Sequence, residues 1–292
     1  MHPMPTQKIR LNGIDINYLD EGEGDALLMV HNLTSNIRDL ARNVPQLSQH
    51  FRVIAADVRG HGFTTHEEDF AAARAFYTFD NMAEDCMALL DYLGVERFHL
   101  FGQAYWGANI AFNLFHRIPE RVRALAVSSS YMISTDPGVP PYSQLSEQAQ
   151  RNFVRMHELA RAGGMDAVFE DRKSNRQFWG AQIFDSEEIM QAFAEAHHLT
   201  SAAAFVTIPY LSHERRAEVA RLLNERQTRL MMLLGVDDSN NGRAITEMRR
   251  DYAATHIVLL PDSAHYPTIE NPQDFNQALL NFYAGAEKFG HV

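Results

Sequence analysis

Residues 98–107 read Phe-His-Leu-Phe-Gly-Gln-Ala-Tyr-Trp-Gly, and the prediction of the fold rests first on this stretch. Phe98–Phe101 is short and apolar, which predicts a strand buried on both faces of a sheet. Residues 107–117 then carry apolar positions at helical spacing. A buried strand that passes through Gly102 almost directly into a helix is typical of a parallel sheet with crossover helices.

Strands and helices alternate on both sides of this stretch. Asn12-Gly13 predicts a tight hairpin between strands at 7–12 and 14–19. The other expected elements, in order, are a strand at 26–30, a helix near 36–48, a strand at 51–56, a helix at 81–93, strands at 122–127 and 229–234, a helix near 243–253, a strand at 256–260 and a helix at 272–286. This alternation predicts an α/β fold with a mainly parallel sheet and helices on both of its faces.

The alternation stops between residues 131 and 212, where helical blocks are expected and no strand is convincing. We therefore predict a core domain formed by residues 1–130 and 213–292, and a helical cap (lid) insertion at 131–212. An insertion of this size over a sheet edge commonly forms the wall of a pocket. A helical decoration without a role in binding remains the alternative.

The composition excludes several kinds of partner. The 292-residue chain has 26 Lys and Arg against 37 Asp and Glu, a net charge of −11, which argues against nucleic acid and anionic membranes. The single cysteine, Cys86, cannot form an internal disulfide, and no metal-ligand cluster, phosphate loop or dinucleotide fingerprint is present. We therefore expect no metal and no cofactor, and a small-molecule substrate as the partner.

The cellular setting is also an expectation from the sequence. The apolar stretches at 26–30 and 230–234 are far too short to span a bilayer, and no apolar export segment follows Met1. The chain is accordingly expected to be soluble and cytoplasmic. Its oligomeric state is not predicted.

Reactive side chains cluster where the expected strands end. In an open parallel sheet, ligands bind beyond the carboxyl ends of the strands. His31-Asn32, Asp57, Asp237-Asp238 and His265-Tyr266 all follow such strands. A histidine and a carboxylate at successive strand ends predict a general base and the partner that orients it.

Together these segments resemble the α/β-hydrolase superfamily, in particular small capped members such as ring-cleavage C–C hydrolases and enol-lactone hydrolases. The resemblance covers about residues 10–130 and 225–285 and is carried by Val53–Gly62, the strand-turn-helix at 98–112, Pro119–Val122, Gly235–Asp238, and His265 with Pro267. The order nucleophile, acid, base along the chain also matches. The resemblance implies that His265 is the catalytic histidine and Asp238 the acid that holds it, with Asp237 as the competing assignment.

The nucleophile position departs from the family pattern. The family elbow reads Gly-x-Ser-x-Gly, whereas Ala104 stands where the serine is expected. Tyr105 would occupy the position in a register shifted by one residue, but the count from Leu93-Gly94 favours Ala104. Trp106 replaces a small residue, and Asn32 replaces the glycine that follows the family's histidine. Loss of a triad serine costs about a millionfold in rate, so this chain should be nearly inactive as an ester hydrolase.

The resemblance also implies an oxyanion hole built from the backbone N–H groups of Leu33 and Tyr105. His61 and Asp57 lie in a family turn and are expected to be structural. The substrate-binding residues expected at the pocket are Asn32, Trp106, Tyr131, Trp179 and Tyr266, with Met132 and Phe178 as further candidates. This aromatic set suggests an apolar or cyclic substrate, although packing of the insertion on the core explains the rings equally well.

Arg172 and Arg176 in the insertion could each receive a substrate carboxylate through the guanidinium fork. For both arginines, however, an exposed surface position is the expectation.

Three interpretations of Ala104 follow. In the favoured one, a parent enzyme carries serine at this position and hydrolyses an ester, a lactone or a C–C bond, because His265 and Asp238 are both retained. In the second, alanine is native and the His265–Asp238 pair performs non-covalent acid/base chemistry as a decarboxylase, lyase or cofactor-free oxygenase. In the third, the chain binds a small molecule without catalysis.

Overall fold

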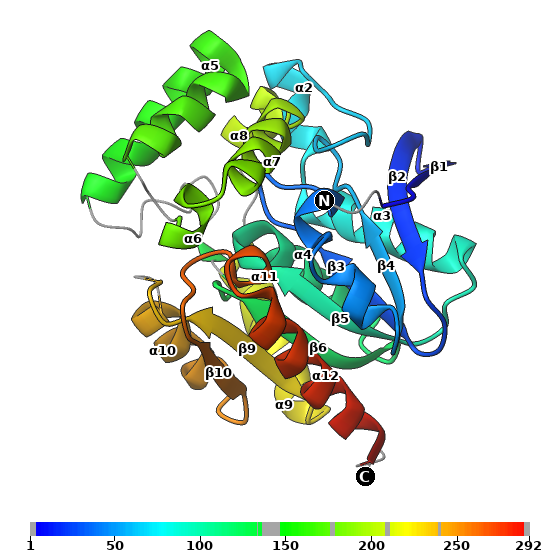
Figure 1. The fold of residues 1–292 in the computed structure, drawn as a ribbon. Helices are drawn as coiled ribbons and strands as arrows, with labels where there is room; N and C mark the ends of the chain where they lie inside the picture. Colours follow the sequence, from blue (N-terminus) through cyan, green and yellow to red (C-terminus); the bar gives the residue numbers. More distant parts are fainter. Residues whose placement is uncertain are drawn as a thin grey trace.

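An eight-stranded sheet forms the centre of the computed structural model, which describes residues 4–132, 134–135, 147–175, 179–207, 211–238 and 241–288 (Figure 1). In spatial order its strands are β1 (Gln7–Leu11), β2 (Ile14–Glu21), β4 (Arg52–Ala56), β3 (Ala26–Val30), β5 (Phe98–Gln103), β6 (Val122–Ser128), β9 (Leu230–Gly235) and β10 (His256–Leu260). The pairings β1–β2 and β2–β4 are antiparallel, and every later pairing is parallel. The predicted mainly parallel α/β sheet is confirmed.

The apolar run of β3 shows why the central strands are hydrophobic on both faces. Leu28 and Val30 pack into one hydrophobic cluster, and Leu27 and Met29 into the other. Successive side chains of a strand point to opposite faces, so a sheet covered on both sides needs apolar residues at every position. The helices that cover the first face are α3 (Phe79–Tyr92), α4 (Ala104–Arg117), α9 (His213–Glu225) and α10 (Asn241–Asp251), and those on the second are α1 (Val44–Leu47) and α12 (Pro272–Lys288).

The helical stretch expected near 36–48 is not one continuous helix. The structure has a 3₁₀ turn, η1 (Ile37–Leu40), followed by the single turn α1. The side chain of Asn36 caps η1, and Pro45 lies in the first turn of α1. Proline is tolerated there, but it cannot continue a helix that begins several residues earlier, because it lacks the N–H group and its ring meets the preceding turn.

Two core helices, α2 (Phe70–Phe76) and α9, are absent from the prediction. In α9 the buried apolar residues are only Val219 and Leu223, on a helix that is otherwise mostly charged. The hairpin prediction, by contrast, is confirmed. Asn12 and Gly13 have positive φ angles of 49° and 79°, as a two-residue turn of this type requires.

The segment 131–212, which the sequence predicts to be an insertion and which is called the insertion below, contains α5 (Glu147–Asn175, kinked at Gly164), α6 (Ala181–Phe184), α7 (Glu187–His198) and α8 (Ala202–Val206). Figure 1 shows these helices grouped on one side of the molecule. These helices contact three elements outside the segment: α6 contacts α11 (Pro267–Glu270), α7 contacts η1, and α8 contacts α2. Since η1 follows β3 and α11 follows β10, the insertion lies against segments beyond the carboxyl ends of the strands.

Two very short strands also occur in the insertion, against expectation: β7 (Ser134–Thr135) pairs in parallel with β8 (Leu211–Ser212). Strands of two residues leave no periodicity for a sequence pattern to reveal. Within the described ranges, no helix combines the length and the apolar character needed to cross a membrane.

Candidate active site

His265 and Asp238 contact each other directly: Nδ1 of His265 lies 2.8 Å from Oδ2 of Asp238. Asp238 follows β9 and His265 follows β10, and these strands pair in parallel, so both loops leave the same edge of the sheet. Asp238 is buried whereas Asp237 is exposed, so Asp238 is the partner of His265. Because a carboxylate only accepts, the hydrogen of the neutral ring is assigned to Nδ1, which gives Nε2 the proton-accepting role.

Glu270 orders the loop around His265, and the sequence pattern did not reveal it. Its Oε2 atom accepts hydrogen bonds from the backbone N–H groups of Ala264 (2.6 Å) and Tyr266 (3.2 Å). Its Oε1 atom accepts one from the N–H of Gly180 in the insertion, at 2.7 Å. One buried carboxylate thus holds the residues on both sides of His265 and ties them to the insertion. No sequence motif signals this role, because it depends on backbone donors.

The turn between β5 and α4 is strained at residue 104. Ala104 is buried and has a φ of +49°, a left-handed conformation that costs an L-residue about 1 kcal/mol. Tyr105 does not share this conformation. A strained residue between a strand and a helix is the backbone geometry that a nucleophile elbow requires.

Two glycines let β5, α4 and β3 approach closely at this turn. A Cβ on Gly102 would lie 2.3 Å from the carbonyl oxygen of Gly107, and a Cβ on Gly107 would lie 2.4 Å from that of Val30. Gly107 is therefore the residue at which α4 lies against β3, and the Trp106 side chain points away from this contact. Its ring is fully buried, with its centroid 4.9 Å from that of His61.

The loop after β3 lies beside the elbow. β3 and β5 are paired neighbours, with Val30 opposite Gly102. The backbone N–H of Trp106 donates to Oδ1 of Asn32 at 3.3 Å, which ties the loop to α4. Leu33 and Tyr105 therefore follow adjacent strand ends, where the resemblance puts the two oxyanion-hole donors.

Asp57 and His61 make contacts of a structural kind. The Asp57 carboxylate accepts hydrogen bonds from Nδ2 of Asn17 and from the backbone N–H groups of Ile37 and Phe63, at 2.7–2.9 Å. Burial lowers the pKa of His61 well below its ordinary value, so its ring is neutral and packs between Trp106 and His31.

Two of the expected substrate-binding aromatics meet in one cluster. The Phe193 ring lies 5.0 Å from Tyr266 and 5.3 Å from Trp179, between centroids, so the insertion packs on the residue that follows His265. Tyr131 lies elsewhere, against Phe112 at 5.3 Å. Met132 is also buried. Phe178 and Arg176 lie outside the described residues.

The expectation of an exposed Arg172 is wrong. The residue is only 9% exposed, and its Nη1 atom lies 2.8 Å from Oγ1 of Thr34 and 3.1 Å from Nε2 of His197. The reason is periodicity: Met165, Val168 and Phe169 form the buried stripe of α5, and position 172 continues it one heptad after Met165. This signal was readable in the sequence.

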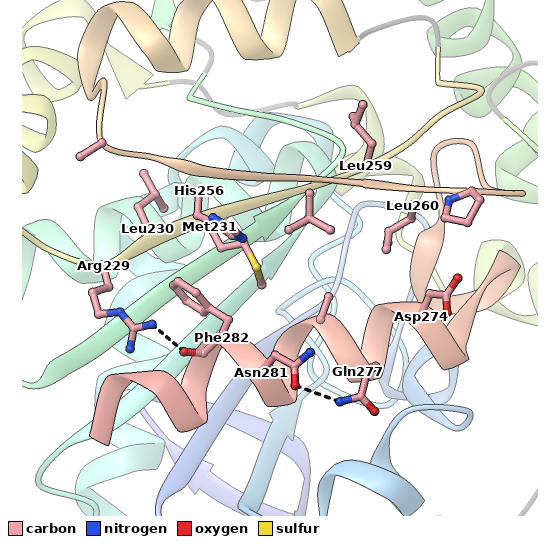
Figure 2. Close-up of a pocket in the computed structure, with 14 residues that line it drawn as sticks. Arg229, Leu230, Met231, His256, Leu259, Leu260, Asp274, Gln277, Asn281 and Phe282 are labelled. Carbon is pink, nitrogen blue, oxygen red and sulfur yellow. Dashed lines mark hydrogen bonds between the residues drawn. The ribbon is translucent and has the colours of Figure 1, made fainter. Parts of the chain in front are cut away.

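A groove of about 700 Å³ lies away from these residues, between β10 and α12 (Figure 2). Along it, Arg229 donates to the carbonyl oxygen of Phe282 at 2.9 Å, and Gln277 donates to Asn281 at 3.0 Å. None of the predicted site residues lines this groove. In the described part of the chain, no group of three or more His, Cys, Asp or Glu side chains is arranged to hold a metal ion.

Part of the chain is similar in sequence to curated enzymes. A fluoroacetate dehalogenase of Burkholderia sp. is 35% identical over 123 residues, which is 41% of this chain and 38% of that protein. A 2-hydroxymuconate semialdehyde hydrolase of Pseudomonas sp. (strain CF600) is 34% identical over 125 residues, which is 42% of each protein. The matched stretch is thus less than half the length of these curated relatives.

The whole fold has solved counterparts. The crystal structure of the enol-lactonase from Burkholderia xenovorans LB400 superposes with a TM-score of 0.74 and 19% identity, over 95% of this chain and 100% of that one. At this identity the likeness shows the fold alone. A family model described as the alpha/beta hydrolase fold matches residues 25–255. This match covers well over half of the chain, which therefore belongs to the α/β-hydrolase fold family.

Proposed function

We propose that this chain is the nucleophile-lacking form of a serine hydrolase, in which Ala104 stands where the parent enzyme has serine. The observation that carries the proposal is the positive φ of Ala104 on the same sheet edge that holds the His265–Asp238 contact. Alanine gains nothing from a left-handed turn, whereas a nucleophile there would be raised out of the helix for attack. The strained backbone and the base are retained although the hydroxyl is absent.

The proposed chemistry is acyl transfer to a serine at position 104. Nε2 of His265 accepts the serine proton as the hydroxyl attacks the substrate carbonyl, and the buried Asp238 stabilises the resulting imidazolium. The N–H groups of Leu33 and Tyr105 face the oxyanion of the tetrahedral intermediate. The intermediate then collapses as the His265 imidazolium gives its proton to the leaving alkoxide or carbanion, which departs and leaves the acyl-enzyme. A water molecule that loses its proton to His265 attacks the acyl-enzyme, and the acid product is released as the proton returns to the serine oxygen. The substrate would be an ester, a lactone or a vinylogous diketone, small and apolar or cyclic.

In this proposal, residues 131–212 form a lid over a core made of 1–130 and 213–292. The contacts of α6 with α11 and of α7 with η1 support it, because α11 and η1 follow the strand ends that carry the candidate residues. Trp179 and Tyr266, joined through Phe193, would form an aromatic wall on the substrate side of the lid.

A second candidate function is non-covalent acid/base chemistry by His265 and Asp238 with a native alanine. The observation in its favour is the hydrogen bond from the Trp106 N–H to Asn32. Both residues depart from the family pattern, and the acceptor of this bond is the side chain of Asn32, which stands where the family has glycine. A single serine-to-alanine change would not produce this pair. Decarboxylation, lyase or cofactor-free oxygenase chemistry would belong here.

The test is to restore the hydroxyl. We expect Ala104→Ser to hydrolyse at least one substrate among p-nitrophenyl esters, lactones and vinylogous diketones, where the unaltered chain has no measurable activity. The double variant Ala104→Ser/His265→Ala is the control and should return the rate to background. No gain on any hydrolysable substrate would reject the serine-hydrolase proposal in favour of non-covalent chemistry. A purely binding protein would show unchanged ligand affinity in His265→Ala and no turnover in any variant.

A further inference from the structure

We propose that Arg172 is a carboxylate-binding subsite of the proposed active site, so that the substrate carries a carboxylate near the reacting bond. This inference rests on the proposed function and deepens it by naming a substrate class. The guanidinium of Arg172 is buried and forms no ion pair with a described residue.

The guanidinium of Arg172 has no acidic partner in the part of the chain that the structure describes. Its hydrogen-bond partners are the Thr34 hydroxyl and the ring of His197, and its Nε atom has no partner among the described residues. Burial lowers the pKa of Arg172, and the adjacent acid, Asp171, acts in the opposite direction through space, but its carboxylate forms its ion pair with Arg155 and not with Arg172. Buried charges in proteins are ordinarily paired, because loss of hydration costs several kcal/mol per ion.

His197 adds no compensating charge. Its Nδ1 atom lies 2.7 Å from the carbonyl oxygen of Phe193, which can only accept, so Nδ1 carries the hydrogen and Nε2 accepts from Arg172. Burial, with the nearby Arg172 as a second cause, lowers the pKa of His197 to about 3. The ring is therefore neutral at physiological pH, and both partners of the guanidinium are uncharged.

The position of Arg172 links this charge to the proposed chemistry. Thr34 directly follows Leu33, the proposed oxyanion donor, and Tyr266 directly follows His265. Burial raises the pKa of Tyr266, and its side chain lies close enough to Arg172, Asn32 and Thr34 for each of them to lower that pKa in turn. The cluster Arg172, Thr34, Asn32 and Tyr266 thus joins helix α5 to the loops that carry both sets of candidate groups.

The geometry of the side chain suits a carboxylate. The Arg172 guanidinium carbon lies 5.4 Å from the centroid of the Phe205 ring, a contact that helps to fix the plane of the fork. A fixed fork can bind two carboxylate oxygens at once. Tyr266 in this cluster and Phe193, whose ring packs against it, favour a carboxylate attached to a flat, apolar body.

Binding can be measured without turnover, so the unaltered chain is used. Calorimetry would compare cinnamate with cinnamamide, which has the same shape and no charge. We expect cinnamate to bind at least ten-fold more tightly, and Arg172→Gln to abolish this preference. Arg151→Gln is the matched control, because Arg151 is exposed on the same helix, and it should retain the preference. Equal binding of acid and amide, or a preference that survives in Arg172→Gln, would overturn the proposal.

Arg172→Lys covers the case in which Arg172→Gln does not fold. It keeps the positive charge and loses the planar fork, so cinnamate should bind about ten-fold more weakly while cinnamamide is unaffected; equal weakening of both would contradict the subsite. The two proposals fail separately. An inactive Ala104→Ser with an intact cinnamate preference rejects only the serine hydrolase, whereas an active Ala104→Ser without that preference rejects only the subsite.

Discussion

Two neighbouring aspartates after β9 differ in their burial and in their contact with His265. Asp238 is buried against the ring of His265, whereas Asp237 is exposed to solvent. In an active Ala104→Ser chain, Asp238→Asn should lower kcat about a thousandfold or more, because the amide no longer stabilises the imidazolium or its working tautomer. Asp237→Asn should change kcat less than threefold. Steady-state kinetics of the two variants checks this, and comparable losses would mean that the geometry does not select the acid.

Single residues were predictable where a motif fixes them. Ala104 and His265 follow from the order of strand ends and from the family resemblance, and the structure gives each the expected position after its strand. Glu270 was not predictable, because it acts on the backbone N–H groups of Ala264 and Tyr266, which no side-chain pattern records. Arg172 was misjudged because an arginine is ordinarily exposed, although it continues the buried stripe of α5.

At the scale of elements, one buried ion pair fastens α3 to the loop after β4. Nε and Nη2 of Arg59 donate to the two carboxylate oxygens of Asp85 at 2.7 and 2.8 Å. Asp85→Asn should lower the free energy of unfolding by about 3 kcal/mol, because Arg59 would remain buried without a counter-charge. Urea denaturation measures the loss. Asp91→Asn is the control, since its exposed ion pair with Arg121 should contribute less than about 1 kcal/mol. Equal midpoints for the two variants would refute this account.

Elements were predicted well where burial imposes a period. β3 and β9 are continuous apolar runs, and β4 and β5 are mostly apolar, because the sheet is covered on both faces; these segments located the strands within a residue or two. α9 failed the same test, since only Val219 and Leu223 of its apolar residues are buried. The two-residue strands β7 and β8 arise from tertiary contact and have no local signal.

For the whole molecule, buried histidines should make stability depend on pH. Burial is the main cause that lowers the pKa of His99 to about 4, from an ordinary value of 6.5. Protons therefore bind the unfolded chain preferentially, and stability falls as the pH drops from about 6.5 towards 4. His99→Phe should remove about 2 kcal/mol of the acid destabilisation at pH 5 relative to pH 7.

Thermal or urea denaturation at the two pH values checks this prediction. Replacing the exposed His50 by Phe should leave the pH dependence unchanged. An identical pH dependence in His99→Phe and in the unaltered chain would show that His99 is protonated at no cost in the folded state.

The overall topology was also readable, because alternating strands and helices leave few ways to build one sheet. The segment 131–212, predicted as a cap, lies between β6 and β9 in the order of elements, and its role as a separate insertion stays a prediction. What the sequence could not supply is the set of contacts that the insertion makes with η1, α2 and α11, since these join segments far apart in the chain. The contacts of the proposed lid are for that reason the least predictable part of the candidate site.

The close glycine contacts at the turn between β5 and α4 fix its backbone shape without involving the side chain of residue 104. A side chain at Gly102 or at Gly107 would collide with the neighbouring backbone. Ala104, in the turn between these glycines, contributes only a methyl group. Evolution or an experimenter can therefore exchange the chemistry of residue 104, from methyl to hydroxyl to thiol, without rebuilding the scaffold. A loss of turnover caused by a change at this position is therefore expected without a comparable change in the free energy of unfolding.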